Sequence, residues 1–213
     1  MERLICLLIG YAFGLIQTGY IYGKINNIDI RTLGSGNAGT TNALRTLGWK
    51  AGVITFIGDC LKCVVAVLLV RFVYKGAGNT DLLAIYTGLG AVLGHNFPFY
   101  LNFKGGKGIA STAGLILAVH PVMFLIVAAV FVSILLITQY VSLGSIVIMI
   151  LFVVQVIVYG QRGGFQLTTS ELYEFYGVAI FLAILAIWQH RANIRRLING
   201  NENKTDVRKI GKK

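Results

Sequence analysis

Charge and cysteine are both scarce in this sequence of 213 residues. Only 13% of the residues are charged and 56% are apolar, whereas a soluble domain of this length needs far more charge to cover its surface. The three cysteines, Cys6, Cys60 and Cys63, lie in apolar segments and have the spacing of neither a metal box nor a disulfide framework. We expect an integral membrane protein whose cysteines are small buried hydrophobes.

Several catalytic motifs are also missing. No His is followed at the fifth position by Asp, which excludes the His-x4-Asp dyad of one large class of glycerolipid acyltransferases. Neither a Gly-x-Ser-x-Gly elbow nor a His-Glu-x-x-His zinc helix occurs. An enzyme with this sequence would act by stabilising charge rather than through a base-activated nucleophile. We expect no metal and no cofactor.

Seven apolar segments account for most of the chain, and most have the length of a membrane-spanning helix. The first has no small-x-small cleavage site after it, so we interpret it as a helix and not as a signal peptide. The fourth is short, and alone it would suit a re-entrant helix. The segments fall at about 3–23, 51–73, 81–100, 109–119, 122–141, 143–160 and 172–190.

The distribution of basic residues favours seven crossings over six. Seven crossings, with the N-terminus outside, place residues 24–50, 101–108 and 190–213 on one side, and these regions carry most of the Lys and Arg. That side should be the cytoplasm, whereas a re-entrant fourth segment would send the basic tail outside. We therefore predict an all-α protein of seven transmembrane helices with a cytoplasmic C-terminus. We expect one catalytic domain over 1–200 and a loosely ordered basic tail over 201–213.

The first polar loop is rich in glycine. Residues 34–42 have the sequence Gly-Ser-Gly-Asn-Ala-Gly-Thr-Thr-Asn, and Arg45 follows. Glycines permit a backbone nest for an anion, and Arg offers a bidentate fork for phosphate or carboxylate. A flexible connection between two helices is the alternative, but the length of the loop and its Arg favour a functional site. The ligand-binding candidates in it are Gly34, Ser35, Gly36, Asn37, Thr41, Asn42 and Arg45.

The second polar loop combines glycine with lysine. It contains Lys104, Gly105, Gly106, Lys107 and Gly108. A nucleotide-binding P-loop is excluded because Gly follows Lys107 where Ser or Thr is needed, and because the upstream glycine spacing is missing. A pair of lysines reaching the lipid headgroups is one interpretation. The small and basic residues at a membrane boundary favour the other, an anion site.

Other polar residues fall at similar depths. His190 and Asn193 are three residues apart at the end of the last apolar segment, where a His can hydrogen-bond a hydroxyl or phosphate. Ser142 lies at a turn on the same side. Asp59 and Lys62 are expected to form an ion pair within the membrane, with direct ligand binding as the alternative.

The two remaining histidines and the tail have structural interpretations. We expect His95 to fix the second loop and His120 to play no part in chemistry. Residues 190–213 hold eight Lys or Arg against Glu202 and Asp206, which suits the anionic cytoplasmic leaflet of a bilayer. Nothing in the tail resembles a folded motif that recognises nucleic-acid bases, so we expect no nucleic-acid partner.

Three motifs together resemble those of the PlsY family, the bacterial membrane acyl-phosphate:glycerol-3-phosphate acyltransferases. They run from Gly34 to Arg45, from Gly94 to Gly108, and from His190 through Gly200 to Glu202. The resemblance covers nearly the whole chain. It implies a seven-helix protein in the bacterial cell membrane, with its site facing the cytoplasm. The implied reaction transfers a fatty acyl group from acyl phosphate to glycerol 3-phosphate, giving lysophosphatidate and inorganic phosphate. We expect the two substrates and the lipid bilayer as its partners, and a monomer.

The resemblance also implies residue roles. The predicted catalytic residues are Ser35, Arg45, Lys104, His190 and Asn193, which with Ser142 would hold glycerol 3-phosphate and orient its hydroxyl. Other residues would surround the phosphate of the donor, namely the loop glycines Gly34, Gly36, Gly105 and Gly106 with Asn37, Thr41, Asn42 and Lys107. The chain departs from the usual family pattern at Leu15, Gln17, Ala38 and Cys63, and none of these residues carries charge that the reaction needs.

Two other functions use similar residues. A transporter of a phosphorylated small molecule would need broken helices in symmetric halves and polar residues at the bilayer midplane, which only Asp59 and Lys62 partly provide. An acyltransferase with thioester donors would need a large adenine- or carrier-binding surface, which the short loops do not supply.

Overall fold

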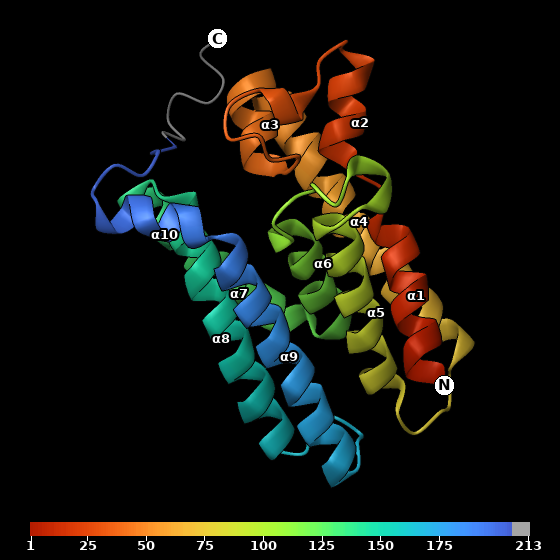
Figure 1. Cartoon of the computed structure of the whole chain (residues 1–213). Coiled ribbons are helices and arrows are strands. Elements are labelled where there is room, and N and C mark those ends of the chain that lie inside the picture. Colours follow the sequence, from red (N-terminus) through yellow and green to blue (C-terminus); the bar gives the residue numbers. More distant parts are fainter. Residues whose placement is uncertain (206–213) are drawn as a thin grey trace. The chain divides into compact units, whose positions relative to one another are not determined.

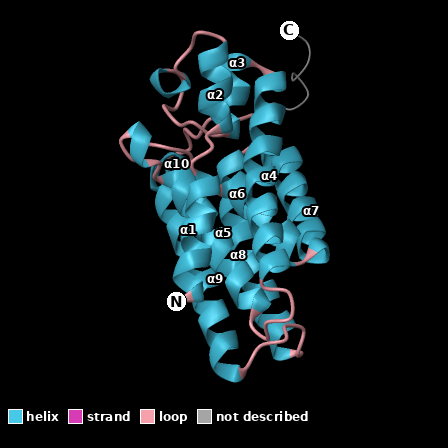
Figure 2. Cartoon of the chain, turned by 90° about the vertical axis from the view of Figure 1, so that its right-hand side faces the viewer, coloured by secondary structure: helices cyan, strands magenta, loops and turns pink. Residues whose placement is uncertain are grey.

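The computed structural model describes residues 1–205, and all regular structure in that range is helical (Figure 2). The chain divides into two compact units, Met1–Val119 and His120–Lys213, which we describe separately. The first unit holds α1 (Glu2–Gly14), α2 (Thr18–Ile25), α3 (Thr40–Leu47), α4 (Trp49–Val73), α5 (Thr80–Asn96) and α6 (Ile109–Val119), with short 3-10 turns at Ile30–Thr32 and Phe99–Leu101. The second holds α7 (Pro121–Thr138), α8 (Val141–Gln161), α9 (Thr169–Gln189) and α10 (Arg191–Ile198) (Figure 1).

The helices agree with the seven predicted apolar segments. Six stretches within residues 1–205 are long and apolar enough to cross a membrane, and the shorter apolar helix Ile109–Val119 coincides with the short fourth segment. The six stretches are Glu2–Ile25, Trp49–Val73, Thr80–Leu101, Pro121–Thr138, Val141–Gln161 and Thr169–Gln189. The all-helical membrane fold is thus confirmed, and its orientation stays a prediction.

Glycines allow α1 and α5 to lie in close contact. Each helix carries a Gly-x-x-x-Gly pair, Gly10 with Gly14 and Gly90 with Gly94. A methyl group at any of the four would collide with a backbone oxygen of the facing helix. Small residues at this spacing let two membrane helices approach until their backbones touch. This contact holds the beginning of the chain against the helix that leads into the second loop.

The first predicted helix, 3–23, is interrupted. It ends at Gly14 as α1 and resumes at Thr18 as α2. The interruption frees backbone carbonyl groups, which in a membrane protein need donors from elsewhere in the chain. The hydroxyl group of Tyr100 donates to the carbonyl oxygen of Leu15 (2.7 Å), and the ammonium group of Lys62 donates to that of Ile16 (2.6 Å).

In the second unit, α8 packs against both α7 and α9. Phe152 on α8 and Phe175 on α9 are fully buried. Thr168 and Glu171 form a capping box at the start of α9, which satisfies two backbone donors that would otherwise lack partners. His120 accepts a hydrogen bond from the Met123 backbone (3.4 Å) at the start of α7.

The predicted loose tail begins with ordered residues. Glu202 and Thr205 are buried, and the Thr205 backbone donates to the carbonyl oxygen of Gln139 (2.8 Å). Residues 206–213, the rest of that tail, lie outside the described range.

Candidate active site

The first loop is organised by the side chain of Asn42. This residue lies in the first turn of α3 and is buried. Its side-chain oxygen accepts from the Ser35 backbone (2.9 Å), and its amide nitrogen donates to the carbonyl oxygens of Ile30 (2.9 Å) and Leu33 (3.0 Å). Both ends of the amide are therefore bonded within the loop.

Two glycines in left-handed conformation flank Ser35. Gly34 has φ +59° and Gly36 has φ +70°, values that other residues adopt only with strain. A methyl group at Gly34 would also collide with the side-chain oxygen of Asn42. Ser35 is exposed at the tip of this turn, so its hydroxyl is accessible to a ligand.

The second loop is fixed by its backbone to the end of α5. The N–H groups of Gly105 and Gly106 donate to the carbonyl oxygens of Asn96 (3.2 Å) and His95 (3.0 Å). A methyl group at Gly105 would meet the carbonyl oxygen of His95, and one at Gly106 would meet the His95 ring. Only glycine fits so close to α5. His95 therefore contacts the second loop through its carbonyl oxygen, which accepts from Gly106, and through its ring, which lies against Gly106.

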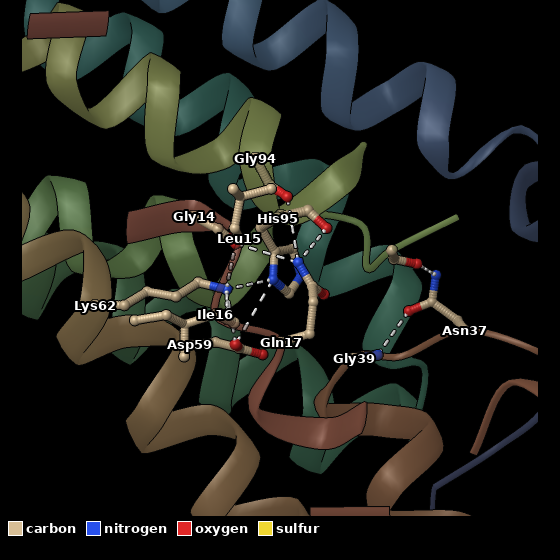
Figure 3. A network of polar contacts seen from close by, with 12 residues as sticks. Gly14, Leu15, Ile16, Gln17, Asn37, Gly39, Asp59, Lys62, Gly94 and His95 are labelled. Carbon is tan, nitrogen blue, oxygen red and sulfur yellow. Dashed lines mark hydrogen bonds and ion pairs between the residues drawn. The ribbon is translucent and has the colours of Figure 1, made fainter. Parts of the chain in front are cut away.

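The side chain of Asn37 joins the two loops. Its oxygen accepts from the Gly39 backbone (3.0 Å), and its amide nitrogen donates to the carbonyl oxygen of Gly105 (3.2 Å) (Figure 3). Arg31 adds a longer contact, from its guanidinium to the carbonyl oxygen of Leu101 (3.5 Å). The two basic, glycine-rich segments thus form one assembly.

Arg31 is itself paired beside the first loop. It forms an ion pair with Asp29 (2.8 Å) and lies over the ring of Tyr20 (4.8 Å to the centroid). The hydrogen bond from Arg31 lowers the pKa of Asp29 to about 2. Asp29 therefore stays ionised, and its charge is compensated by Arg31.

The other predicted residues of the first unit belong to these two loops or to α3, which follows the first. Arg45 and Lys104 are exposed, and Thr41 and Lys107 are partly buried. Thr41 lies in the first turn of α3 and Arg45 in its last. Lys107 lies two residues before the start of α6. Helix N-termini and clustered cations both favour anions.

The second unit brings Ser142 and Asn193 together at Glu202. One carboxylate oxygen of Glu202 accepts from the Ser142 hydroxyl (2.9 Å) and the Asn193 amide (2.7 Å). The other accepts from Arg196 (2.7 Å). Burial alone would raise the pKa of Glu202, but the hydrogen bonds from Asn193, Arg196 and Ser142 and the charge of Arg196 outweigh it, so the pKa is lowered.

His190 lies where α9 ends and α10 begins. It is buried, and its Nδ1 lies 2.7 Å from the carbonyl oxygen of Ala186. A carbonyl oxygen can only accept, so Nδ1 carries a proton; Nε2 accepts when the ring is neutral and donates when it is protonated. The sequence motif that ends at Glu202 predicts no role for this residue, although a carboxylate among basic residues is a signal for an organising ion pair.

The predicted ion pair of Asp59 and Lys62 is present, with Asp59 Oδ1 and Lys62 Nζ 3.0 Å apart. The sequence did not reveal three additional contacts. Lys62 lies 2.8 Å from Nδ1 of His95, and Gln17 donates to the carbonyl oxygens of Gly94 (3.2 Å) and His95 (3.1 Å). No spacing rule relates these residues, because they lie on different helices.

These features define a helical membrane protein with several candidate spans and two joined, glycine-rich basic loops. The family model for glycerol-3-phosphate acyltransferase matches residues 4–200. A glycerol-3-phosphate acyltransferase of Clostridioides difficile (strain 630) is 46% identical, over 99% of this chain and 96% of the relative. One of Thermoanaerobacter sp. (strain X514) is 42% identical, over 96% of each.

Solved structures support the same family as the family model and the relatives. The crystal structure of PlsY, an integral membrane glycerol 3-phosphate acyltransferase, in its glycerol 3-phosphate form has a TM-score of 0.84 and 35% identity, covering 99% of this chain and 98% of that one. The lysophosphatidic acid form has a TM-score of 0.82 and 33% identity, covering all of both chains. The chain belongs to the glycerol-3-phosphate acyltransferase family.

Proposed function

We propose that this chain acylates glycerol 3-phosphate with an acyl phosphate as donor, and releases 1-acyl-glycerol 3-phosphate and inorganic phosphate. The observation that carries the proposal is the hydrogen bond from Asn37 to Gly105, because it unites two basic loops into one site. Both substrates carry phosphate groups that would repel each other without cations between them. The family supports acylation of glycerol 3-phosphate, and no relative reported above supports a transporter.

The reaction is an acyl transfer from a mixed anhydride. The 1-hydroxyl oxygen of glycerol 3-phosphate forms a bond to the acyl carbonyl carbon, and the bond from that carbon to the phosphate oxygen breaks. The hydroxyl proton ends on the phosphate group, whose second pKa is about 6. Phosphate is already a good leaving group, so the enzyme needs to position the substrates and stabilise charge.

In the first unit, the cations neutralise the two phosphates. Arg45, Lys104 and the exposed Ser35 would hold glycerol 3-phosphate. Lys107, Thr41 and the glycines of the first loop would surround the donor phosphate, whereas Asn37 and Asn42 hold the loops in place and Gly105 and Gly106 let the second loop lie close to α5. The backbone bonds of Gly105 and Gly106 fix this loop before any ligand arrives, which lowers the entropy cost of binding.

In the second unit, the hydrogen bonds to Glu202 determine whether a side chain can still donate a hydrogen bond to a substrate or only accept one. The Ser142 hydroxyl gives its only proton to Glu202, so it can only accept a hydrogen bond from a ligand. A glycerol hydroxyl donates, whereas a phosphate dianion does not. We therefore assign Ser142, with His190 and Asn193, to the glycerol end of glycerol 3-phosphate.

The protein is a multi-span helical membrane protein, and we propose that its site faces the cytoplasm of a bacterial cell. The basic residues around both loops and the C-terminal tail support this orientation. We further propose a monomer in which residues 1–200 form one catalytic domain.

A donor assay tests the proposal. Purified protein in detergent receives glycerol 3-phosphate with either acyl phosphate or acyl-CoA, and lysophosphatidate is measured. Product from acyl phosphate alone is expected, and product from acyl-CoA alone would refute the proposed donor. Uptake of glycerol 3-phosphate into sealed vesicles without product would instead support the transporter.

A further inference from the structure

A positive charge lies deep in the first unit, outside the two loops. Lys62 is on the membrane-spanning helix α4 and is only 5% exposed. Four polar atoms surround its ammonium nitrogen: the carbonyl oxygens of Gly14 (3.2 Å) and Ile16 (2.6 Å), Asp59 Oδ1 (3.0 Å) and His95 Nδ1 (2.8 Å). Burying a charge is costly, so this arrangement invites a functional explanation.

Two of these contacts supply hydrogen bonds to backbone carbonyl groups at the break between α1 and α2. The carbonyl groups of Gly14 and Ile16 lie at the interruption of the helix and have lost their helical donors. Lys62 donates to both, and its charge suits the negative end of α1. Asp59, one turn earlier on α4, balances the charge. Lys62 thus fixes the position of the first membrane segment against α4.

The contact with His95 extends this network toward the loops. An ammonium group can only donate, so Nδ1 of His95 accepts from Lys62 and the ring proton is on Nε2. The Nε2 edge lies against Gly106, where even a methyl group would not fit. The carbonyl oxygen of the same His95 accepts from Gly106 N–H (3.0 Å) and from Gln17 (3.1 Å).

The chain of contacts then reaches the first loop. Gly105 donates to the carbonyl oxygen of Asn96 (3.2 Å), and its own carbonyl oxygen accepts from Asn37. Figure 3 shows the two ends of this chain of contacts, the group of Asp59, Lys62, Gln17 and His95 and, apart from it, Asn37 with Gly39. Every link is a hydrogen bond or a van der Waals contact between buried or half-buried groups.

We propose that Lys62 is a positioning residue for substrate binding, which sets the place of the second loop by holding the His95 ring against Gly106. It touches no substrate. Without its hydrogen bond the ring is free to turn, and Gly105 and Gly106 lose a fixed support. The lysines of the loop would then meet a phosphate at the wrong distance. This inference rests on the proposed function, because it assumes that the loop binds a phosphorylated substrate.

A pair of nearly isosteric variants tests the hydrogen bond. Asp59→Leu with Lys62→Met removes both charges and every side-chain donor from this side of His95, and Asp59→Leu with Lys62→Gln removes both charges but keeps a donor near His95. We expect the first to raise the KM for glycerol 3-phosphate roughly tenfold, as expected when one charge-assisted hydrogen bond is lost. The second should recover most of that loss. Equal KM values for the two variants would overturn the proposal.

The same helices supply a matched control. Arg71 on α4 pairs with Asp81 on α5 (2.7 Å) away from the loops. Arg71→Met removes an ion pair between the same two helices, so it should lower the melting temperature in detergent and leave KM within twofold of wild type. If the methionine variant at Lys62 lowers only the melting temperature, as Arg71→Met does, its role is structural and the proposal fails.

A variant of His95 keeps the test decisive if the methionine variant does not fold. His95→Asn retains an acceptor for Lys62 but removes the ring edge from Gly106, so KM should again rise roughly tenfold. An unchanged KM would refute the coupling. If wild type makes no product from acyl phosphate, the proposed function fails separately. Calorimetric binding of glycerol 3-phosphate to the same variants then tests the positioning role.

Discussion

Glu202 offers the sharpest test of the second unit. Its side chain is 2% exposed and accepts three hydrogen bonds, from Ser142, Asn193 and Arg196. Glu202→Gln keeps the shape, but an amide has one oxygen, so its NH2 group either faces the N–H of Arg196 or makes Ser142 and Asn193 turn their donors away. One charged hydrogen bond is then lost and the others weaken.

The loss in the free energy of unfolding caused by Glu202→Gln follows from these contacts. A hydrogen bond to a charged group contributes about 1.5–3 kcal/mol, and the neutral amide recovers part of the desolvation cost of the carboxylate. Arg196 is 36% exposed, so its contribution is reduced by solvent. A net loss of about 3 kcal/mol is expected, which corresponds to a fall in melting temperature of roughly 6–12 °C for a chain of this size.

The contribution of Glu202 to stability depends on pH in a direction that its pKa determines. Because the pKa of folded Glu202 is below its ordinary value of 4.5, its stabilisation is present above that value and is lost as the pH falls through the folded pKa. Thermal unfolding in detergent should therefore show a large difference between wild type and Glu202→Gln at pH 7. The difference should shrink below about pH 4.5.

A matched control is available in the same unit. Glu171 at the capping box can be replaced by Gln, which also serves at this position, so Glu171→Gln should shift the melting temperature by no more than about 2 °C. A difference between wild type and Glu202→Gln that stays constant down to pH 3 would contradict a buried, ionised Glu202.

Two further predictions concern the first unit. Arg45→Ala and Lys104→Ala should each lose at least about 90% of the activity, as expected when one charged contact to a phosphate is removed. Both variants should keep the wild-type melting temperature because both side chains are exposed. Retained activity in the acyl phosphate assay would remove these residues from the site. Gly106→Ala should raise the KM for glycerol 3-phosphate by about tenfold or more because its methyl group would displace the His95 ring. Gly78→Ala, where a methyl group meets open space, should behave as wild type in the same assay.

Much of the fold could be predicted because a bilayer imposes simple rules on sequence. The short helix Ile109–Val119 was expected at 109–119, since polar loops bound its apolar run. The interruption after Gly14 could not be predicted, because the run 3–23 contains no proline and no charged residue after Arg3. That interruption depends on donors far away in the chain, Lys62 and Tyr100.

The site was predictable in its residues and less so in their functions. Asn42 and Ser142 are residue types that can bind a phosphate or a hydroxyl, and the sequence favoured them as ligands. In the structure the Asn42 amide is bonded within its loop, and the Ser142 proton is given to Glu202. Residue type alone cannot separate a group that binds a ligand from one that organises the groups that do. Only the hydrogen-bond partners separate them.

The way in which the second loop is held determines what mutations of its lysines can reveal. Its glycines are fixed by backbone N–H groups donating to backbone carbonyl oxygens at the end of α5, and Asn37 also bonds to a backbone oxygen. No side chain of the loop takes part in these bonds, so removing the ammonium group of Lys104 leaves them intact. A loop held in this way can keep its cations at a fixed place in the absence of ligand, which is the condition for stabilising charge without reorganisation. The loss of activity in Lys104→Ala can therefore be attributed to the missing charge of the lysine. The effect of Gly106→Ala instead reports whether the position of the second loop matters.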